Sequence, residues 1–281
     1  MKYTPFDKYP SNLVIILATI GITLSFNIFG SLISIFSDSI NFEINVKIIQ
    51  SISQIVFLFG AAILLSNIIP LKFKTLFRLE ENINFKYIFW GVIGLFFLNL
   101  FNTGYINLQE YLIPNSLISY YLDYKDFIES LYERILKGRD AYDFVVALLI
   151  GAIIPAVSEE FLFRGFGQRS LEENNSAKYS IIVIAIIFGV IHFNLINLIP
   201  LFLIGVFLGY LAFTSKNILV PIFIHFLNNA FAILFLYIGE PEIISNENDI
   251  SMTTSIILTL VGLLGVLAII RILLQSGNSE T

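Results

Sequence analysis

Residues 144–165 read FVVALLIGAIIPAVSEEFLFRG. The run is long and apolar enough for an α-helix that crosses the hydrocarbon core of a membrane, which takes about 20 residues. Two adjacent acids, Glu159 and Glu160, and the base Arg164 interrupt its second half. Charged side chains are expensive to bury in an apolar span, so they are expected to face a bundle interior and are candidates for function.

The rest of the chain is equally apolar. Of 281 residues, 57% are hydrophobic and 13% are charged, and the mean hydropathy is +0.83. The sequence therefore predicts an all-α, polytopic membrane helical bundle with about eight spans. We expect these spans at residues 13–36, 48–69, 87–108, 144–165, 179–196, 198–213, 218–238 and 256–274. The fifth and sixth are short and lie close together near Pro200, so a merged or re-entrant pair, and hence seven spans, is the alternative.

The chain shows no soluble segment and no repeat of fixed period, so we expect a single integral membrane domain over residues 1–281. The motif-bearing catalytic region is expected at 144–238. The longest connection runs over residues 109–143, where Phe127, Leu131 and Ile135 recur every four residues among charged side chains. This pattern predicts an amphipathic helix at the membrane interface, as a connector or, less simply, a lid.

Lys and Arg residues indicate the orientation of the spans. With both termini in the cytoplasm, eleven Lys and Arg residues fall on the cytoplasmic side and five on the other side. The loop at residues 239–253 carries acids and no base. The positive-inside rule therefore favours cytoplasmic termini. The first apolar run is too long for a signal-peptide core, and we expect it to be retained as a helix.

Charge and cysteine content exclude several classes of function. The formal net charge is -5, with no basic patch of the kind that a nucleic acid would require. The chain has no cysteine, so a thiol nucleophile, a disulfide and a thiolate metal site are excluded. The partners that remain are the lipid bilayer and a peptide or protein substrate at the membrane.

The chain has two histidines, His192 and His225, and both fall inside expected spans. At a rise of about 1.5 Å per residue, Glu159, His192, His225 and Asn229 lie roughly 14 to 24 Å from the same side of the membrane. Three separate helices thus place polar groups in one layer, an arrangement that chemistry explains better than packing.

Helical spacing suggests different roles for these groups. Glu160 and Arg164 are four residues apart on one helical face and can pair. Glu159 is rotated by about 100° from Glu160 around the helix axis, so it stays available as a general base. His225 and Asn229 share a face and can donate to an oxyanion. The structural alternatives are a plain ion pair for Glu160, an Arg164 that reaches the interface, and interhelical hydrogen bonds for the histidines.

The residues leave the mechanism open between two versions. A zinc ion held by His192, His225 and Glu159 is one, although the chain lacks the HExxH pattern that places two ligands on one helical face. A glutamate that activates water without any cofactor is the other, and we favour it. A serine nucleophile is poorly supported, because no GxSxG pattern occurs.

Three segments carry a resemblance to a known family. SEEFLFRG, FGVIH and HFLNN resemble, in this order, the Glu-Glu-x-x-x-Arg, Phe-x-x-x-His and His-x-x-x-Asn motifs of the CAAX prenyl protease and bacteriocin-processing family of intramembrane peptidases. The resemblance implies the following catalytic residues and roles. Glu159 is the general base, His192 positions the water, Glu160 and Arg164 support the site, and His225 and Asn229 form the oxyanion hole.

The resemblance also implies a reaction, the hydrolysis of a peptide bond in a membrane-associated peptide or protein tail. Eukaryotic relatives remove the last three residues of prenylated CaaX proteins. The short loops and the Asn- and Ile-rich composition favour a bacterial plasma membrane, where such substrates are not expected. Two alternatives stay open, a non-catalytic bacteriocin-immunity or scaffold protein and a proton-coupled transporter.

Overall fold

A computed structural model describes residues 9–36, 42–138, 140–238 and 250–278. Most of the loop expected at residues 239–253, with the first and last few residues of the chain, lies outside the described residues. Over the described ranges the chain forms helices joined by turns and short irregular segments, with no strand. The predicted all-α helical bundle is therefore confirmed.

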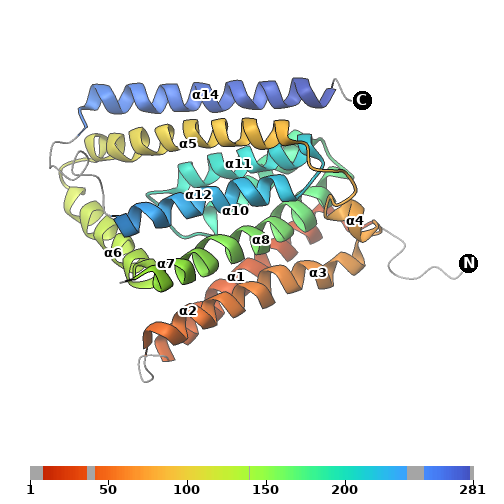
Figure 1. The fold of residues 1–281 in the computed structure, drawn as a ribbon, viewed down its shortest axis with the longest axis horizontal. Helices are drawn as coiled ribbons and strands as arrows, with labels where there is room; N and C mark the ends of the chain where they lie inside the picture. The colour runs from red at the N-terminus through yellow and green to blue at the C-terminus, as the bar shows by residue number, and fades with distance from the viewer. Residues whose placement is uncertain (1–8, 37–41, 139, 239–249, 279–281) are drawn as a thin grey trace, which may run out of the picture.

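The first half of the chain forms two long hairpin arms and a long single helix, followed by a helix that crosses one end of the bundle (Figure 1). Its elements are α1 (Asn12–Phe36), α2 (Phe42–Ser53), η2 (Gln54–Gly60), α3 (Ala61–Leu65), η3 (Ser66–Ile68), α4 (Phe73–Leu76), α5 (Phe85–Leu112) and α6 (Ile118–Leu136). The segment η2 is π-helical, with a wider turn than its α-helical neighbours, and α2, η2 and α3 run on without a break.

The second half begins with another continuous helix made of α-helical and π-helical pieces. Its elements are α7 (Ala141–Leu148), η4 (Leu149–Ile153), α8 (Ile154–Glu160), η5 (Phe161–Arg169) and α9 (Ser170–Glu172), and the chain continues with α10 (Ala177–Val190), α11 (Leu198–Ser215), α12 (Leu219–Ile238) and α14 (Met252–Asn278). The segments η4 and η5 are π-helical.

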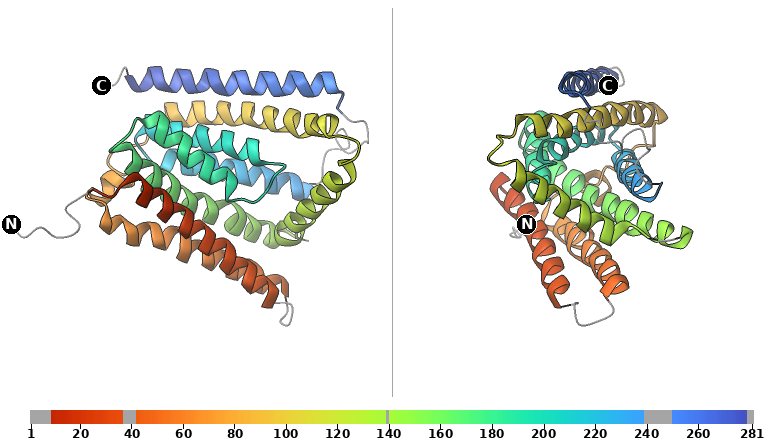
Figure 2. Two further views of the ribbon diagram at one scale, coloured as in Figure 1. Left: turned by 180° about the vertical axis from the view of Figure 1, so that it is seen from behind. Right: turned by 90° about the vertical axis from the view of Figure 1, so that its left-hand side faces the viewer.

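The helices stack in layers (Figure 1, Figure 2). Helices α5 and α14 lie side by side at one edge, α10, α11 and α12 come next, α8 with its flanking pieces follows, and the α1–α3 hairpin forms the opposite edge. The contact between α5 and α14 is very close, since a Cβ at Gly262 would lie 2.4 Å from the backbone nitrogen of Phe101. Small residues permit such close approach of helices in membranes. The central position of α8 leaves its polar side chains enclosed by protein.

Seven helices in the described ranges are long and apolar enough to cross a membrane, which makes the chain an integral membrane protein. The fifth expected span is shorter than predicted. It becomes α10, with 14 residues and a length of about 21 Å at the usual rise, followed by an irregular turn. With α10 counted as a further pass, α1 begins and α14 ends at the same end of the bundle (Figure 1, Figure 2). The cytoplasmic location of the two termini stays a prediction.

The connection at residues 109–143 contains the helix that the amphipathic pattern predicts, α6. It crosses the end of the bundle opposite to the start of α1 (Figure 1). Phe127 and Leu131 on this helix are 57% and 37% exposed, so part of its apolar stripe is not covered by the described chain, as expected of an interfacial helix. Its position next to the turn after α10 bears on the candidate site.

Candidate active site

The Glu-Glu-x-x-x-Arg motif straddles the junction of α8 and η5. Glu159 and Glu160 are the last residues of α8, and Arg164 lies in the π-helical segment that follows. Widened π-helical turns interrupt α-helices frequently at functional sites. All three side chains are buried, Glu160 and Arg164 completely and Glu159 to 9% exposure.

Glu160 binds two cationic or donor groups. Its Oε2 lies 3.3 Å from Nε of Arg164, and its Oε1 lies 2.9 Å from Nδ1 of His225. The pairing along the helix is the one that four-residue spacing predicts. The contact with His225 joins α8 to α12, and it was not anticipated from the sequence.

Arg164 is held by further contacts. Its Nη2 donates to the carbonyl oxygen of Gly205 on α11 at 3.2 Å, and its guanidinium carbon lies 5.1 Å from the centre of the Phe188 ring, within the range of a cation–π contact. Because the side chain is fully buried, the alternative in which Arg164 reaches the membrane interface is wrong.

Glu159 has a different environment from its neighbour. Its Oε2 is buried and has no hydrogen-bond partner among the described residues, and Nε2 of His225 lies 3.9 Å from it. The side chain lines a cavity of about 240 Å³. Glu160 is thus held in an ion pair, and Glu159 lines the cavity.

His192 lines the same cavity, but it lies outside a helix. The sequence places it within the span 179–196, whereas α10 ends at Val190 and the chain then turns. Phe193 adopts a left-handed backbone conformation with φ 50°, and the side-chain Oδ1 of Asn194 accepts a hydrogen bond from the Asn197 N–H at 3.2 Å. This local turn ends the helix, and irregular backbone at membrane depth is tolerated where protein or a cavity surrounds it.

The tautomer of His192 follows from its contact with Phe188. Nδ1 of His192 lies 2.5 Å from the Phe188 carbonyl oxygen. A carbonyl can only accept, so Nδ1 carries the proton, and in the neutral ring Nε2 is left as an acceptor.

The ring of Phe188 is central to the site. Its centre lies 4.7 Å from the ring centre of His192 and 6.0 Å from that of His225, and it also contacts Arg164 and Phe163. It therefore separates and orients the two imidazoles by packing.

Asn229 is less closely tied to the other candidates. It lies one turn beyond His225 on α12, and its Oδ1 accepts a hydrogen bond of 3.2 Å from Nδ2 of Asn228. The amide Nδ2 of Asn229 is then the group available to donate. Among the described residues that line the cavity with Glu159 and His192, Asn229 does not occur.

A metal ion would require several ligands at one point. Within the described ranges, no three His, Asp or Glu side chains converge in an arrangement that could hold one. In the described structure His192, His225 and Glu159 thus form no preformed three-ligand set, and the metal-free mechanism stays a proposal.

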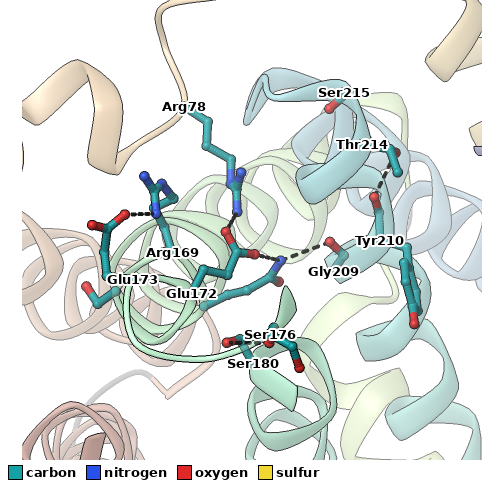
Figure 3. A network of polar contacts seen from close by, with 12 residues as sticks. Arg78, Arg169, Glu172, Glu173, Ser176, Ser180, Gly209, Tyr210, Thr214 and Ser215 are labelled. Atoms are coloured by element: carbon teal, nitrogen blue, oxygen red, sulfur yellow. Dashed lines mark hydrogen bonds and ion pairs between the residues drawn. The ribbon is translucent and has the colours of Figure 1, made fainter. Parts of the chain in front are cut away.

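Polar side chains continue from Arg164 at every fourth residue of the same helix, and sequence reasoning missed them. We call Arg164, Gln168 and Glu172 the polar ladder. Gln168, four residues on, donates from Nε2 to the Gly209 carbonyl oxygen at 3.0 Å and to Oε1 of Glu172 at 2.9 Å. Glu172 in turn binds Arg78, as Figure 3 shows. Burial lowers the pKa of the Arg78 guanidinium, and the neighbouring Glu172 carboxylate opposes this shift.

The ladder fixes the rotation of the helix that carries the glutamates. Arg164 and Gln168 bind carbonyl groups four residues apart on α11, so both helices present the same spacing to each other. The signal for the ladder was present in the sequence as the four-residue spacing from Glu160 to Glu172.

Helix α6 also contributes to the site, through tyrosines that the sequence did not single out. Tyr124 donates from its hydroxyl to the Phe193 carbonyl oxygen at 3.0 Å, and Tyr132 lines the cavity. Removal from water raises the pKa of the Tyr132 hydroxyl, a hydrogen bond with Asn194 opposes the shift, and the charge of Glu159 adds to it. The Tyr132 side chain is 50% exposed as a whole, so it is the hydroxyl end that reaches inward.

Comparison with known proteins adds an independent finding. Residues 141–231 match the family model described as Rce1-like, type II CAAX prenyl endopeptidase. Over 147 residues the chain is 26% identical to a protein of Bacillus subtilis (strain 168) named "Putative membrane peptidase YdiL". This match covers 52% of the chain and 55% of the relative, so the chain spans about half the length of that relative. No solved structure matches.

The matched region contains all three motifs, from the acids of α8 to Asn229 on α12. Through residues 141–231 the chain thus shares the sequence pattern of the Rce1-like CAAX prenyl endopeptidases, and the resemblance indicated by its three motifs is confirmed.

Proposed function

We propose that the protein is an intramembrane endopeptidase that hydrolyses a peptide bond of a membrane-associated peptide or protein tail, with a water molecule activated by Glu159. The observation that carries the proposal is that the two adjacent acids have different surroundings. Glu160 pairs with Arg164 at 3.3 Å and accepts a hydrogen bond from His225 at 2.9 Å, whereas Glu159 lies 3.9 Å from His225 and lines the cavity. A general base needs an oxygen that is free to take a proton.

The first step uses Glu159 and His192. Glu159 accepts a proton from water while the water oxygen bonds to the carbonyl carbon of the scissile peptide. Nε2 of His192 accepts a hydrogen bond from the same water, because Nδ1 is occupied by the Phe188 carbonyl. The tetrahedral intermediate then carries a negative oxygen.

The second step uses His225 and Asn229. Nδ1 of His225 donates to Glu160, so Nε2 can donate to the oxyanion only if the ring is an imidazolium. An imidazolium, together with the Arg164 guanidinium, balances the charges of the two glutamates. Asn229 supplies a second donor from Nδ2. The C–N bond breaks as Glu159 returns its proton to the leaving amine.

The test is cleavage of quenched fluorescent peptides that carry a prenyl or palmitoyl anchor, by purified protein in nanodiscs. Glu159→Gln should abolish cleavage, with a loss of at least about 10³-fold, because it removes the base. The matched control is Glu133→Gln, since Glu133 pairs with Lys137 on the exposed face of α6. It should leave the rate unchanged.

Other outcomes separate the alternatives. Cleavage by Glu159→Gln at the wild-type rate would contradict the role of this acid, and loss of wild-type cleavage on chelation would contradict the metal-free step. Failure of wild type to cleave any peptide of the panel, together with full biological effect of Glu159→Gln in cells, would favour a scaffold or immunity protein. Substrate flux in proteoliposomes without cleavage would favour a transporter.

A further inference from the structure

The cavity beside Glu159 has polar walls that the proposed hydrolysis does not use. It lies between the α1–α3 hairpin, α6, and the helix that carries the glutamates. The part of its lining contributed by the hairpin includes several uncharged polar side chains, Thr23, Asn27, Gln50, Ser51 and Gln54. Polar groups at membrane depth that point into a cavity indicate a ligand that presents polar atoms.

The backbone around the cavity is unusual in a way that supports this interpretation. The three π-helical segments of the described chain, η2, η4 and η5, all contribute lining residues, Gln54 and Leu58 from the first, Ile150 and Gly151 from the second, and Phe163 from the third. Such widened turns are kept at functional sites, where they redirect side chains at some cost in helix stability. Three of them at one cavity mark it as a built site.

Two polar side chains of α1 are already bound. Asn27 donates from Nδ2 to the carbonyl oxygens of Thr23 and of Ile191, at 3.0 and 3.2 Å, and so ties α1 to the turn that carries His192. Thr23 donates from its hydroxyl to carbonyl oxygens of its own helix. These residues shape the wall.

Gln54 differs from them. Its side chain is 7% exposed and lines the cavity, and its Oε1 is buried without a hydrogen-bond partner among the described residues. Leaving a buried acceptor unsatisfied costs about 1–3 kcal/mol. A carboxamide oxygen only accepts, so its complement is an N–H or O–H donor, and in a peptide chain the donor present at every non-proline residue is the backbone N–H.

We propose that the cavity binds the substrate peptide in an extended form and that Oε1 of Gln54 accepts a hydrogen bond from one backbone N–H of that peptide. The inference rests on the proposed function, because it names the part of the substrate that the cavity recognises. A contact with the backbone holds the peptide in register beside Glu159 and selects no particular side chain. The ligand class is therefore an unfolded, lipid-anchored peptide tail of variable sequence.

The test uses binding, so that it does not depend on turnover. Protein carrying Glu159→Gln in nanodiscs is incubated with a library of palmitoylated pentapeptides of random sequence, and the retained peptides are quantified by mass spectrometry. Addition of Gln54→Leu, which keeps the volume and removes the acceptor, should weaken retention about tenfold. The matched control is Gln275→Leu on the exposed side of α14, which should leave retention unchanged.

A second arm begins with Gln54 intact, so it tests for a backbone contact even if Gln54→Leu fails to fold. Retained peptides are resynthesised with one backbone amide methylated at a time. Methylation at one position should weaken binding about tenfold, and in the Gln54→Leu background the same methylation should add no further loss.

The outcomes distinguish this inference from the proposed function. Binding that depends on Gln54, without cleavage by wild type, would uphold the peptide site and overturn the hydrolysis. Cleavage that is indifferent to Gln54→Leu and to every methylation would overturn the peptide site and uphold the hydrolysis. Absence of any retained peptide would overturn the site.

Discussion

Nδ1 of His225 lies 2.9 Å from Oε1 of Glu160, and this contact joins α12 to the helix that carries both acids. The other ring nitrogen, Nε2, is 3.9 Å from Glu159. The imidazole thus bonds to one acid and only approaches the other. Stability and activity should therefore respond differently to the loss of each acid.

Glu160→Gln should lower the free energy of unfolding by about 3 kcal/mol or more, because it leaves the fully buried Arg164 without its carboxylate. Glu159→Gln should change it by less than about 1 kcal/mol, because its Oε2 has no hydrogen bond to lose within the described chain. Unfolding in SDS titrations would measure both. Equal destabilisation by the two variants would show that the acids share one structural role.

Gly165→Ala should destabilise the protein by about 1–3 kcal/mol through overpacking. A Cβ at this position would lie 2.4 Å from a ring carbon of Phe77, which is completely buried, so its ring has little room to shift. The same SDS titration tests it, with Gly21→Ala as the control, since nothing lies within 4 Å of a Cβ at Gly21. Partial rescue by Phe77→Leu would locate the clash, and an unaffected Gly165→Ala protein would contradict it.

Glu172→Gln should cost about 3 kcal/mol, because Arg78 is buried to 7% exposure and loses its charged partner. The comparison is Glu173→Gln, one residue on. Its partner Arg169 is 19% exposed, and such a pair is worth less than about 1 kcal/mol. Thermal unfolding followed by circular dichroism distinguishes the two, and similar losses would mean that burial of the Arg78 pair is unimportant.

Much of the architecture follows from hydropathy and spacing. Long apolar runs predict the helices because a helix in lipid satisfies its own backbone, and the pair of Glu160 and Arg164 follows from helical geometry. The end of α10 at Val190 does not follow, since residues 191 and 193 are as apolar as the helix before them. The turn is set by the backbone of Phe193 and by Asn194, which a hydropathy window averages away.

The long-range part of the site is harder to predict. Depth estimates place His225 near the acids, yet they do not tell which ring nitrogen meets which carboxylate. The structure joins Nδ1 to Glu160, which leaves Nε2 as the candidate donor. Gln54 is an ordinary polar residue in an apolar helix when read alone. Its candidate role becomes visible only in the folded chain, where it lines a cavity together with residues about a hundred positions away.

The buried charges of the glutamate helix also bear on how the protein enters its membrane. Each charged side chain near the centre of an isolated helix opposes insertion by about 2.5–3.5 kcal/mol, and residues 141–172 bring Glu159, Glu160 and Arg164 together in one segment. Two of the groups that relieve this penalty, the Gly205 carbonyl and His225, belong to α11 and α12, which are synthesised later. The segment is therefore expected to settle at its final depth only after those helices have arrived, so that biogenesis and the candidate chemistry depend on the same contacts.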